Sequence, residues 1–309
     1  MPIVVLNRTV ISRFNSYRGV LKIMSITTRR VQTGNYETFI HEGGTKNAET
    51  IIFLHGSGPG ASASANWKDV LPHYVDRFHV VAPDVLGFGD TDHPEQYPEN
   101  GVEWMNRRIE QVIDLMDSLN LEKAHLVGNS LGGVIALHMN MHSPERIDKI
   151  VLMGAGGGLT EPTPELAKLA NFHKDPSPKA FKNLLSWFLY DLDGMEEKLD
   201  AIVAERYELF TRPDIRKSYE ENFTKSSLSD MLVPPSALKR MTNEFLMIHG
   251  HQDRFVPLQS SLYMLDYVEN AELHIFKRCG HWAQVEQKEQ FIKLTKDFFE
   301  RNAVPSLVN

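Results

Sequence analysis

Residues 124–137 read AHLVGNSLGGVIAL: an apolar run, a glycine-rich turn with Ser130 at its centre, and a second apolar run. The first run has the length and composition of a buried strand, and the second can begin a helix. Gly128 and Gly132 lie two residues before and two residues after Ser130. Small residues at these places permit a sharp, strained turn that presents a side chain. The stretch therefore predicts an α/β domain, in which Ser130 is either an ordinary turn residue or a nucleophile.

The rest of the chain alternates strands and helices. Further short apolar runs, which read as strands, cover residues 49–55, 79–83, 149–153, 245–249 and 273–276. Apolar residues at helical spacing over 105–119 predict an amphipathic helix, and residues 285–301 predict a closing helix. This alternation favours a mainly parallel sheet with helices on both faces.

The alternation stops between about residues 156 and 241, where aromatic residues and prolines are frequent and no strand is predicted. An insertion between two core strands is most simply a helical cap over the carboxyl edge of the sheet, where open α/β sheets bind ligands. We therefore expect a core of residues 29–155 and 242–309, a cap or lid of residues 156–241, and an N-terminal extension of residues 1–28.

Composition limits the classes of function. The chain has 309 residues, a net charge of −7 and no dense basic run interleaved with aromatics, which argues against nucleic-acid binding. No apolar run is long enough to span a membrane. The single cysteine, Cys279, favours a reducing compartment and a cytoplasmic protein. The basic, acid-free residues 1–36 suggest a tail, a transit peptide or a later start at Met24.

A serine nucleophile needs a base, and the chain holds 13 histidines, so position decides among them. His281 follows one predicted strand and precedes the closing helix, whereas Asp253 follows the preceding strand. Ser130, Asp253 and His281 would therefore lie at carboxyl ends of strands in one sheet, where they can converge. They follow the chain order of one known class of triad hydrolases. The alternatives are that Asp253 is a turn or cap residue and His281 a residue at the start of a helix.

An oxyanion hole requires two N–H donors. One is expected from Leu131, directly after the nucleophile, and the second from Ser57 or Gly58 in the glycine-rich loop HGSGPG at 55–60. That loop lacks the spacing and the Lys-Ser/Thr of a phosphate-binding loop, so no nucleotide is expected. His138 and His142 are spaced to bind zinc, but without a third ligand they are interpreted as structural, and no metal or other cofactor is expected.

Several motifs together resemble the meta-cleavage product hydrolases, which are α/β-hydrolases that split carbon–carbon bonds in ring-fission products of aromatic catabolism. The motifs are HGSGPG (55–60), Asn66-Trp67, PDVLGFGDTD (83–92), GNSLGG (128–133), FLYD (188–191), DRFVPL (253–258) and RCGHWAQ (278–284). The resemblance covers about residues 29 to 300. It implies a C–C hydrolase of the α/β-hydrolase fold that acts on 2-hydroxy-6-oxohexa-2,4-dienoates with a variable group at carbon 6. The products would be 2-hydroxypenta-2,4-dienoate and a carboxylic acid.

The resemblance also implies roles for residues. Ser130, Asp253 and His281 match the triad, and the N–H groups of Ser57 and Leu131 match the oxyanion hole. The residues expected around the dienoate are Gly58, Asn66, Asn129, Arg206 and Trp282. Arg206 would clamp the 1-carboxylate, and His281 would move the proton that converts the dienol into its keto form. Attack by Ser130 and attack by an activated water both remain open, and a homo-oligomer is expected from the family.

Other functions carried by this scaffold need different residues at the site. Dehalogenases and soluble epoxide hydrolases need a carboxylate where this chain has Ser130. A carboxylesterase or perhydrolase uses the same triad but does not need an arginine for a charged substrate end, so Arg206 discriminates. A hormone-type receptor would use the fold for binding alone. The stretches HGSGPGASASANW and FLYD are closer to family members that act on small 6-alkyl products than to the biphenyl type.

Overall fold

The computed structural model of the chain describes residues 25–301, and its centre is an eight-stranded sheet. The strands are β1 (Thr27–Thr33), β2 (Tyr36–Gly43), β3 (Thr50–Leu54), β4 (His79–Pro83), β5 (Ala124–Asn129), β6 (Ile147–Met153), β7 (Glu244–Gly250) and β8 (Ala271–Phe276). Their spatial order is β1-β2-β4-β3-β5-β6-β7-β8. The pairs β1–β2 and β2–β4 are antiparallel, and all others are parallel. The mainly parallel α/β sheet predicted from the sequence is confirmed, each predicted strand lying within two residues of its expected bounds.

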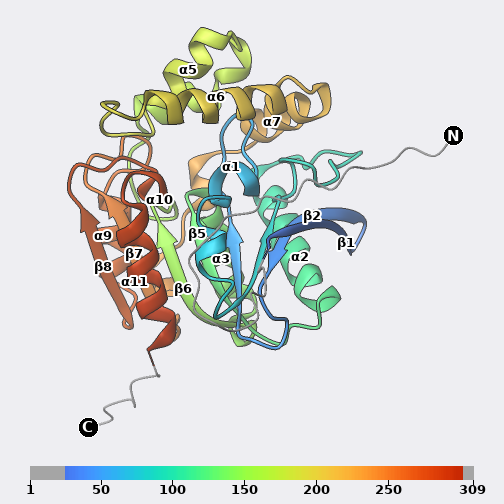
Figure 1. Cartoon of the computed structure of the whole chain (residues 1–309), viewed down its shortest axis with the longest axis vertical. Helices are drawn as coiled ribbons and strands as arrows, with labels where there is room; N and C mark the ends of the chain where they lie inside the picture. Colours follow the sequence, from blue (N-terminus) through green and yellow to red (C-terminus); the bar gives the residue numbers. More distant parts are fainter. Residues whose placement is uncertain (1–24, 302–309) are drawn as a thin grey trace, which may run out of the picture.

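Alternating side chains of each central strand enter two separate hydrophobic layers. In β3, Ile52 and Leu54 face one layer, whereas Ile51 and Phe53 face the other. The first layer is completed by α2 (Gly101–Ser118), α3 (Leu131–His142) and α9 (Gln259–Leu265), the second by α1 (Ala63–Trp67) and α11 (Lys288–Glu300). Helices thus cover both faces of the sheet, as Figure 1 shows.

The β1–β2 hairpin was not predicted. Five of the seven β1 residues are exposed, so the strand lacks the apolar pattern that marked the others. It is held by full antiparallel pairing with β2 and by contacts with α2. β1 begins at Thr27, so the expected extension of residues 1–28 lies almost entirely outside the described residues, as does Met24.

Helices alone connect β6 to β7 within the described chain. They are α4 (Pro164–Ala170), α5 (Pro178–Ser186), α6 (Glu196–Phe210), α7 (Pro213–Lys225) and the short α8 (Pro235–Leu238), with intervening 3₁₀ turns. In Figure 1, α5, α6 and α7 lie above the sheet at the top of the view. Leu169, Phe181, Phe210 and Tyr219 belong to a third hydrophobic cluster, distinct from the two layers beside the sheet.

The predicted closing helix differs from the observed one. Instead of one helix over 285–301, the chain forms α10 (Ala283–Glu286) and then α11, separated by Gln287 with a non-helical φ of −124°. The break places Glu286 in a short helix of its own, next to the loop that carries His281. No helix among residues 25–301 combines the length and the hydropathy needed to cross a membrane.

Candidate active site

Ser130 occupies a sharp turn between β5 and α3. Its φ of 53° lies in the left-handed region, which is strained for a residue other than glycine. The turn is possible because its neighbours are small: a β-carbon on Gly128 would lie 2.5 Å from the main chain of Gly132. The Ser130 N–H donates to the Met153 carbonyl at 3.0 Å, which anchors the turn to β6. The turn is therefore fixed on both sides by close main-chain packing.

Asp253 and His281 form a buried hydrogen-bonded pair. The distance from Asp253 Oδ2 to His281 Nδ1 is 2.6 Å, and both side chains are almost fully buried. Asp253 Oδ1 accepts the N–H groups of Phe255 at 2.8 Å and Val256 at 3.0 Å. Burial opposes ionisation of this carboxyl, but the charge and hydrogen bond of His281, with the other donors, lower its pKa overall. An ionised Asp253 accepts a hydrogen bond from the Nδ1–H of His281, which leaves Nε2 of His281 to act as the base.

The turn that carries Ser130 meets the Asp253–His281 pair at the end of β6. Ser130 bonds to the carbonyl of Met153, and the next residue, Gly154, has a φ of +50°. A β-carbon on Gly154 would lie 3.1 Å from both Asp253 Oδ2 and His281 Nδ1. The structure thus brings the three predicted residues together at the carboxyl ends of β5, β7 and β8.

The loop after β3 packs directly on the same turn. A β-carbon on Gly56 would lie 2.9 Å from Asn129 Oδ1 and 3.1 Å from Ser130 Cβ. Ser57 follows Gly56 along this loop, so its N–H lies in the segment closest to the nucleophile. Leu131 is the first residue of α3, and N–H groups of a first helical turn have no acceptor within the helix. Both expected donors therefore belong to segments that flank Ser130.

Arg206 of α6 reaches this loop from the helical segment above. Its Nε donates to the Pro59 carbonyl at 3.1 Å, while its Nη2 is buried without a hydrogen-bond partner. A β-carbon on Gly58 would lie 3.1 Å from Nη2, and the Trp282 ring centroid lies 5.4 Å from the guanidinium carbon. Burial lowers the pKa of Arg206 to about 10. Asn66 of α1 also has a buried side-chain amide nitrogen without a partner.

A buried N–H group without a hydrogen-bond partner costs free energy of folding, and a bound ligand that accepts its hydrogen bond removes that cost. A guanidinium N–H and an amide N–H suit a carboxylate or a carbonyl oxygen. Asn129 differs from Asn66, because its side-chain nitrogen donates to the Met153 carbonyl at 3.0 Å. His138 and His142 lie on α3 with contacts to the Met231 carbonyl and the Ser143 hydroxyl.

Aromatic side chains that the sequence interpretation did not assign also surround the site. The Phe188 ring stacks between Phe255 and Trp282, with centroid distances of 3.9 and 4.4 Å, and lies 5.5 Å from the His281 ring. The Phe188 carbonyl accepts the His281 N–H at 2.8 Å. The motifs FLYD and DRFVPL contain Phe188 and Phe255. Stacking between residues so far apart in the chain leaves no pattern in the local sequence from which it could be predicted.

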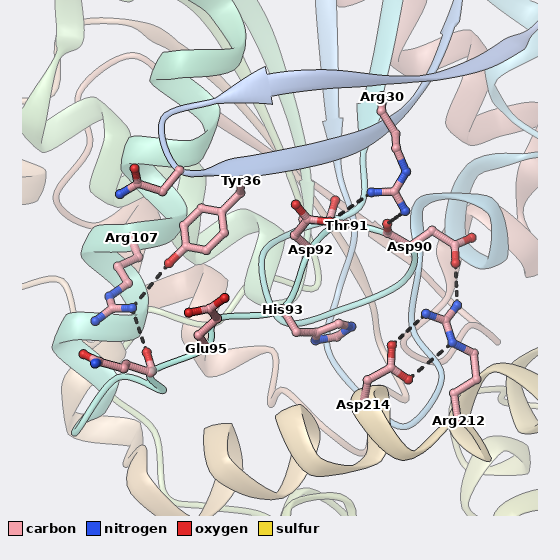
Figure 2. Close-up of a pocket in the computed structure, with 12 residues that line it drawn as sticks. Arg30, Tyr36, Asp90, Thr91, Asp92, His93, Glu95, Arg107, Arg212 and Asp214 are labelled. Atoms are coloured by element: carbon pink, nitrogen blue, oxygen red, sulfur yellow. Dashed lines mark hydrogen bonds and ion pairs between the residues drawn. The ribbon is translucent and has the colours of Figure 1, made fainter.

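A separate polar cleft of about 730 Å³ lies between the β1–β2 turn, the loop after β4 and the start of α7 (Figure 2). Its three arginines are paired: Arg30 with Asp92 at 3.0 Å, Arg107 with Glu103 at 2.5 Å and Arg212 with Asp214 at 2.8 Å. The side chains drawn around it include none of the predicted site residues. This cleft therefore offers no unpaired guanidinium comparable with Arg206 and is distinct from the site around Ser130.

Comparison with known proteins agrees with this geometry. The family model described as "alpha/beta hydrolase fold" matches residues 49–288. The 2-hydroxy-6-oxo-2,4-heptadienoate hydrolase of Pseudomonas putida is 34% identical over 273 residues, which cover 87% of this chain and 95% of that protein. The 2-hydroxy-6-oxo-6-phenylhexa-2,4-dienoate hydrolase of Burkholderia cepacia is 34% identical over 280 residues, which cover 88% of this chain and 94% of that protein.

Solved structures give the same result. The 2-hydroxy-6-oxo-6-phenylhexa-2,4-dienoate hydrolase from Rhodococcus sp. strain RHA1 superposes with a TM-score of 0.87 at 36% identity, covering 90% of this chain and 100% of that one. A meta-cleavage product hydrolase from Pseudomonas fluorescens IP01 superposes with a TM-score of 0.80 at 35% identity, covering 88% of this chain and 97% of that one.

Proposed function

Because the chain belongs to the α/β-hydrolase fold family and, within it, to the meta-cleavage product hydrolases, we propose that it hydrolyses a carbon–carbon bond. The substrate is a 2-hydroxy-6-oxohexa-2,4-dienoate that carries a substituent at carbon 6. The products are 2-hydroxypenta-2,4-dienoate and the carboxylic acid that retains the substituent. The protein is therefore an enzyme, a hydrolase of C–C bonds in ketonic substances.

The reaction needs proton transfer before any bond breaks. Loss of the 2-hydroxyl proton and protonation at carbon 5 gives the keto form, in which the departing fragment can accept electrons. His281 carries out these transfers, supported by its 2.6 Å contact with Asp253. Ser130, or a water activated by His281, then adds to the carbon 6 carbonyl, whose oxyanion is held by the N–H groups of Ser57 and Leu131. The bond between carbons 5 and 6 breaks, and its electron pair stays with the dienoate fragment. Where Ser130 is the nucleophile, a water activated by His281 then hydrolyses the acyl-enzyme and releases the carboxylic acid.

The observation that carries the proposal is the buried Arg206 guanidinium with an unpartnered Nη2 beside the loop that packs on Ser130. A neutral ester would leave this charge unsatisfied, whereas the 1-carboxylate of a dienoate pairs with it. Asn66, Asn129 and Trp282 then surround the 2-oxo group, with the Gly58 main chain close by.

We propose the same division of the chain as before: a core of residues 29–155 and 242–309, a cap of residues 156–241 and an extension of residues 1–28. The helices α4 to α7, which contribute to a hydrophobic cluster apart from the two layers beside the sheet, support this cap. Phe255 and Trp282 join that cluster from the core side, and the Phe188 ring lies 5.5 Å from the His281 ring, which supports a cap that packs against the histidine loop.

The test uses two coloured ring-fission products, one with a 6-alkyl group and one with a 6-phenyl group, mixed with the purified protein at neutral pH without added metal. We expect loss of the dienoate absorbance, no turnover by Ser130→Ala, and binding of the dienoate by that variant. We expect the 6-alkyl product to have the higher kcat/KM, in line with the motifs at 55–67 and 188–191.

Two outcomes would redirect the assignment. Cleavage of p-nitrophenyl acetate with no reaction of either dienoate would indicate a carboxylesterase or perhydrolase on the same triad. Binding of a dienoate with no turnover by the unaltered protein would indicate a ligand receptor of this fold.

We also propose a cytoplasmic location and self-association. The location is supported by the use of a single, buried cysteine, since an oxidising compartment favours paired cysteines. Light scattering of the purified protein measures its mass in solution, and a mass of one chain, 35.2 kDa, would contradict self-association.

A further inference from the structure

Glu286 joins two segments that are far apart in the sequence. Its Oε2 accepts the Gly280 N–H at 2.6 Å, and its Oε1 accepts the Tyr190 N–H at 2.7 Å. Gly280 immediately precedes His281, and Tyr190 lies two residues after Phe188 in the segment above the core. One carboxylate therefore bridges the histidine loop and segment 188–190.

The two bridged segments are in direct contact on the side of His281. The Phe188 carbonyl accepts the N–H groups of both His281, at 2.8 Å, and Trp282, at 3.4 Å. A β-carbon on Gly280 would lie 2.5 Å from the Phe188 carbonyl oxygen. The His281 N–H is thus held by the Phe188 carbonyl, and the Glu286 side chain bonds to both the Tyr190 and the Gly280 main chain.

We propose that Glu286 is a positioning residue for the reaction: by bridging the Gly280 and Tyr190 N–H groups it keeps the His281 imidazole aligned between Asp253 and Ser130. The inference rests on the proposed function for its substrate, but the geometry concerns the triad itself. Carboxylate acceptors of N–H groups form strong, directional hydrogen bonds, and a histidine displaced by about 1 Å can slow a reaction on the order of 100-fold. Glu286 acts through His281 and is not a catalytic residue.

Substitutions at this position separate alignment from folding. Glu286→Gln keeps the length of the side chain but replaces one acceptor oxygen with an amide donor, which would face a main-chain N–H. Glu286→Ala removes both acceptors. Glu289→Gln is the matched control, because Glu289 is an exposed residue in the first turn of α11 and its loss changes the charge equally.

Two readouts are needed. The first is steady-state turnover of the 6-alkyl dienoate. The second is the rate at which a fluorophosphonate labels Ser130: the serine oxygen bonds to phosphorus, fluoride leaves, and His281 takes the proton. Labelling tests the triad without any dienoate. Thermal unfolding of each variant measures the folded fraction.

We expect Glu286→Gln to lower kcat and the labelling rate by roughly 10- to 100-fold, with KM changed less than about threefold, because the carboxylate-binding residues lie on other segments. Glu286→Ala, which removes both acceptor oxygens, should be slower still. Labelling and kcat of Glu286→Gln within about twofold of the unaltered protein would overturn the inference. If the unaltered protein is labelled but turns over no dienoate, slow labelling of Glu286→Gln still supports it, and only the proposed substrate fails.

Discussion

Arg206 provides the sharpest test of how the fold and the function are linked. Its guanidinium is buried with one hydrogen bond to the chain, to the Pro59 carbonyl, and burial lowers its pKa to about 10. A shift of this size corresponds to a penalty of about 3 kcal/mol for the charged group in the folded chain. We expect Arg206→Met to remove that penalty while filling much of the same volume.

The gain is offset by what the variant loses. The hydrogen bond to Pro59 and the contact with the Trp282 ring are each worth about 1–2 kcal/mol. The free energy of unfolding of Arg206→Met should therefore stay within about 1 kcal/mol of the unaltered protein. That small change contrasts with the roughly 3–5 kcal/mol lost when one partner of a buried ion pair is removed.

Ligand binding should respond very differently. Loss of a buried, charge-assisted contact to the dienoate carboxylate costs about 2–4 kcal/mol, or roughly 30- to 1000-fold in Kd. Unfolding in urea, followed by tryptophan fluorescence, measures the stability. Titration of the coloured dienoate into proteins that also carry Ser130→Ala measures the Kd without turnover. Arg216→Met, at an exposed position on α7, is the matched control and should change neither quantity.

The reasoning would be refuted by an Arg206→Met protein that binds the dienoate within about threefold of the unaltered Kd. It would also be refuted by a loss of more than about 3 kcal/mol in stability with binding retained, since Arg206 would then be a structural arginine.

Three further predictions concern the framework around the site. Gly132→Ala should lower the free energy of unfolding, measured by chemical denaturation, by more than about 2 kcal/mol. The reason is that the added β-carbon would lie 2.2 Å from the Leu54 carbonyl oxygen. Unchanged stability would contradict this close packing. The hydrogen bond from His79, followed by contacts with Arg29, lowers the pKa of Glu42 to about 2 in the folded chain. At a pH above the pKa that Glu42 has in the unfolded chain, the ionised carboxylate therefore stabilises the fold. This contribution is lost as the pH falls toward 2. Glu42→Gln should therefore be less stable by about 2–3 kcal/mol at pH 6 but nearly equal at pH 2, and a pH-independent difference would exclude this linkage. Burial raises the pKa of the Cys279 thiol, so iodoacetamide should modify it only after unfolding, as mass spectrometry can test; rapid modification of the native protein would show that the loop opens.

The local sequence was sufficient for much of the fold. The six strands from β3 to β8 were predicted because each contains a short apolar run with a turn after it. For the inner strands β3 to β7, burial on both faces of the sheet requires such runs. The serine turn was equally visible, because glycines at fixed offsets are what its geometry needs. The hairpin of β1 and β2 was missed because an edge strand with exposed polar side chains has no apolar pattern.

The three residues Ser130, Asp253 and His281 could be proposed from the chain alone, because each follows a predicted strand and parallel strands end at the same edge of a sheet. Three contacts could be learned only from the tertiary structure. Arg206 is buried beside Pro59, and the Phe188 carbonyl holds the main chain of His281. Glu286 bridges Gly280 and Tyr190. These contacts join segments that are distant in sequence and have no shared periodicity. Their geometry depends on how the helical segment 156–241 packs on the sheet, and that packing is decided by the whole chain.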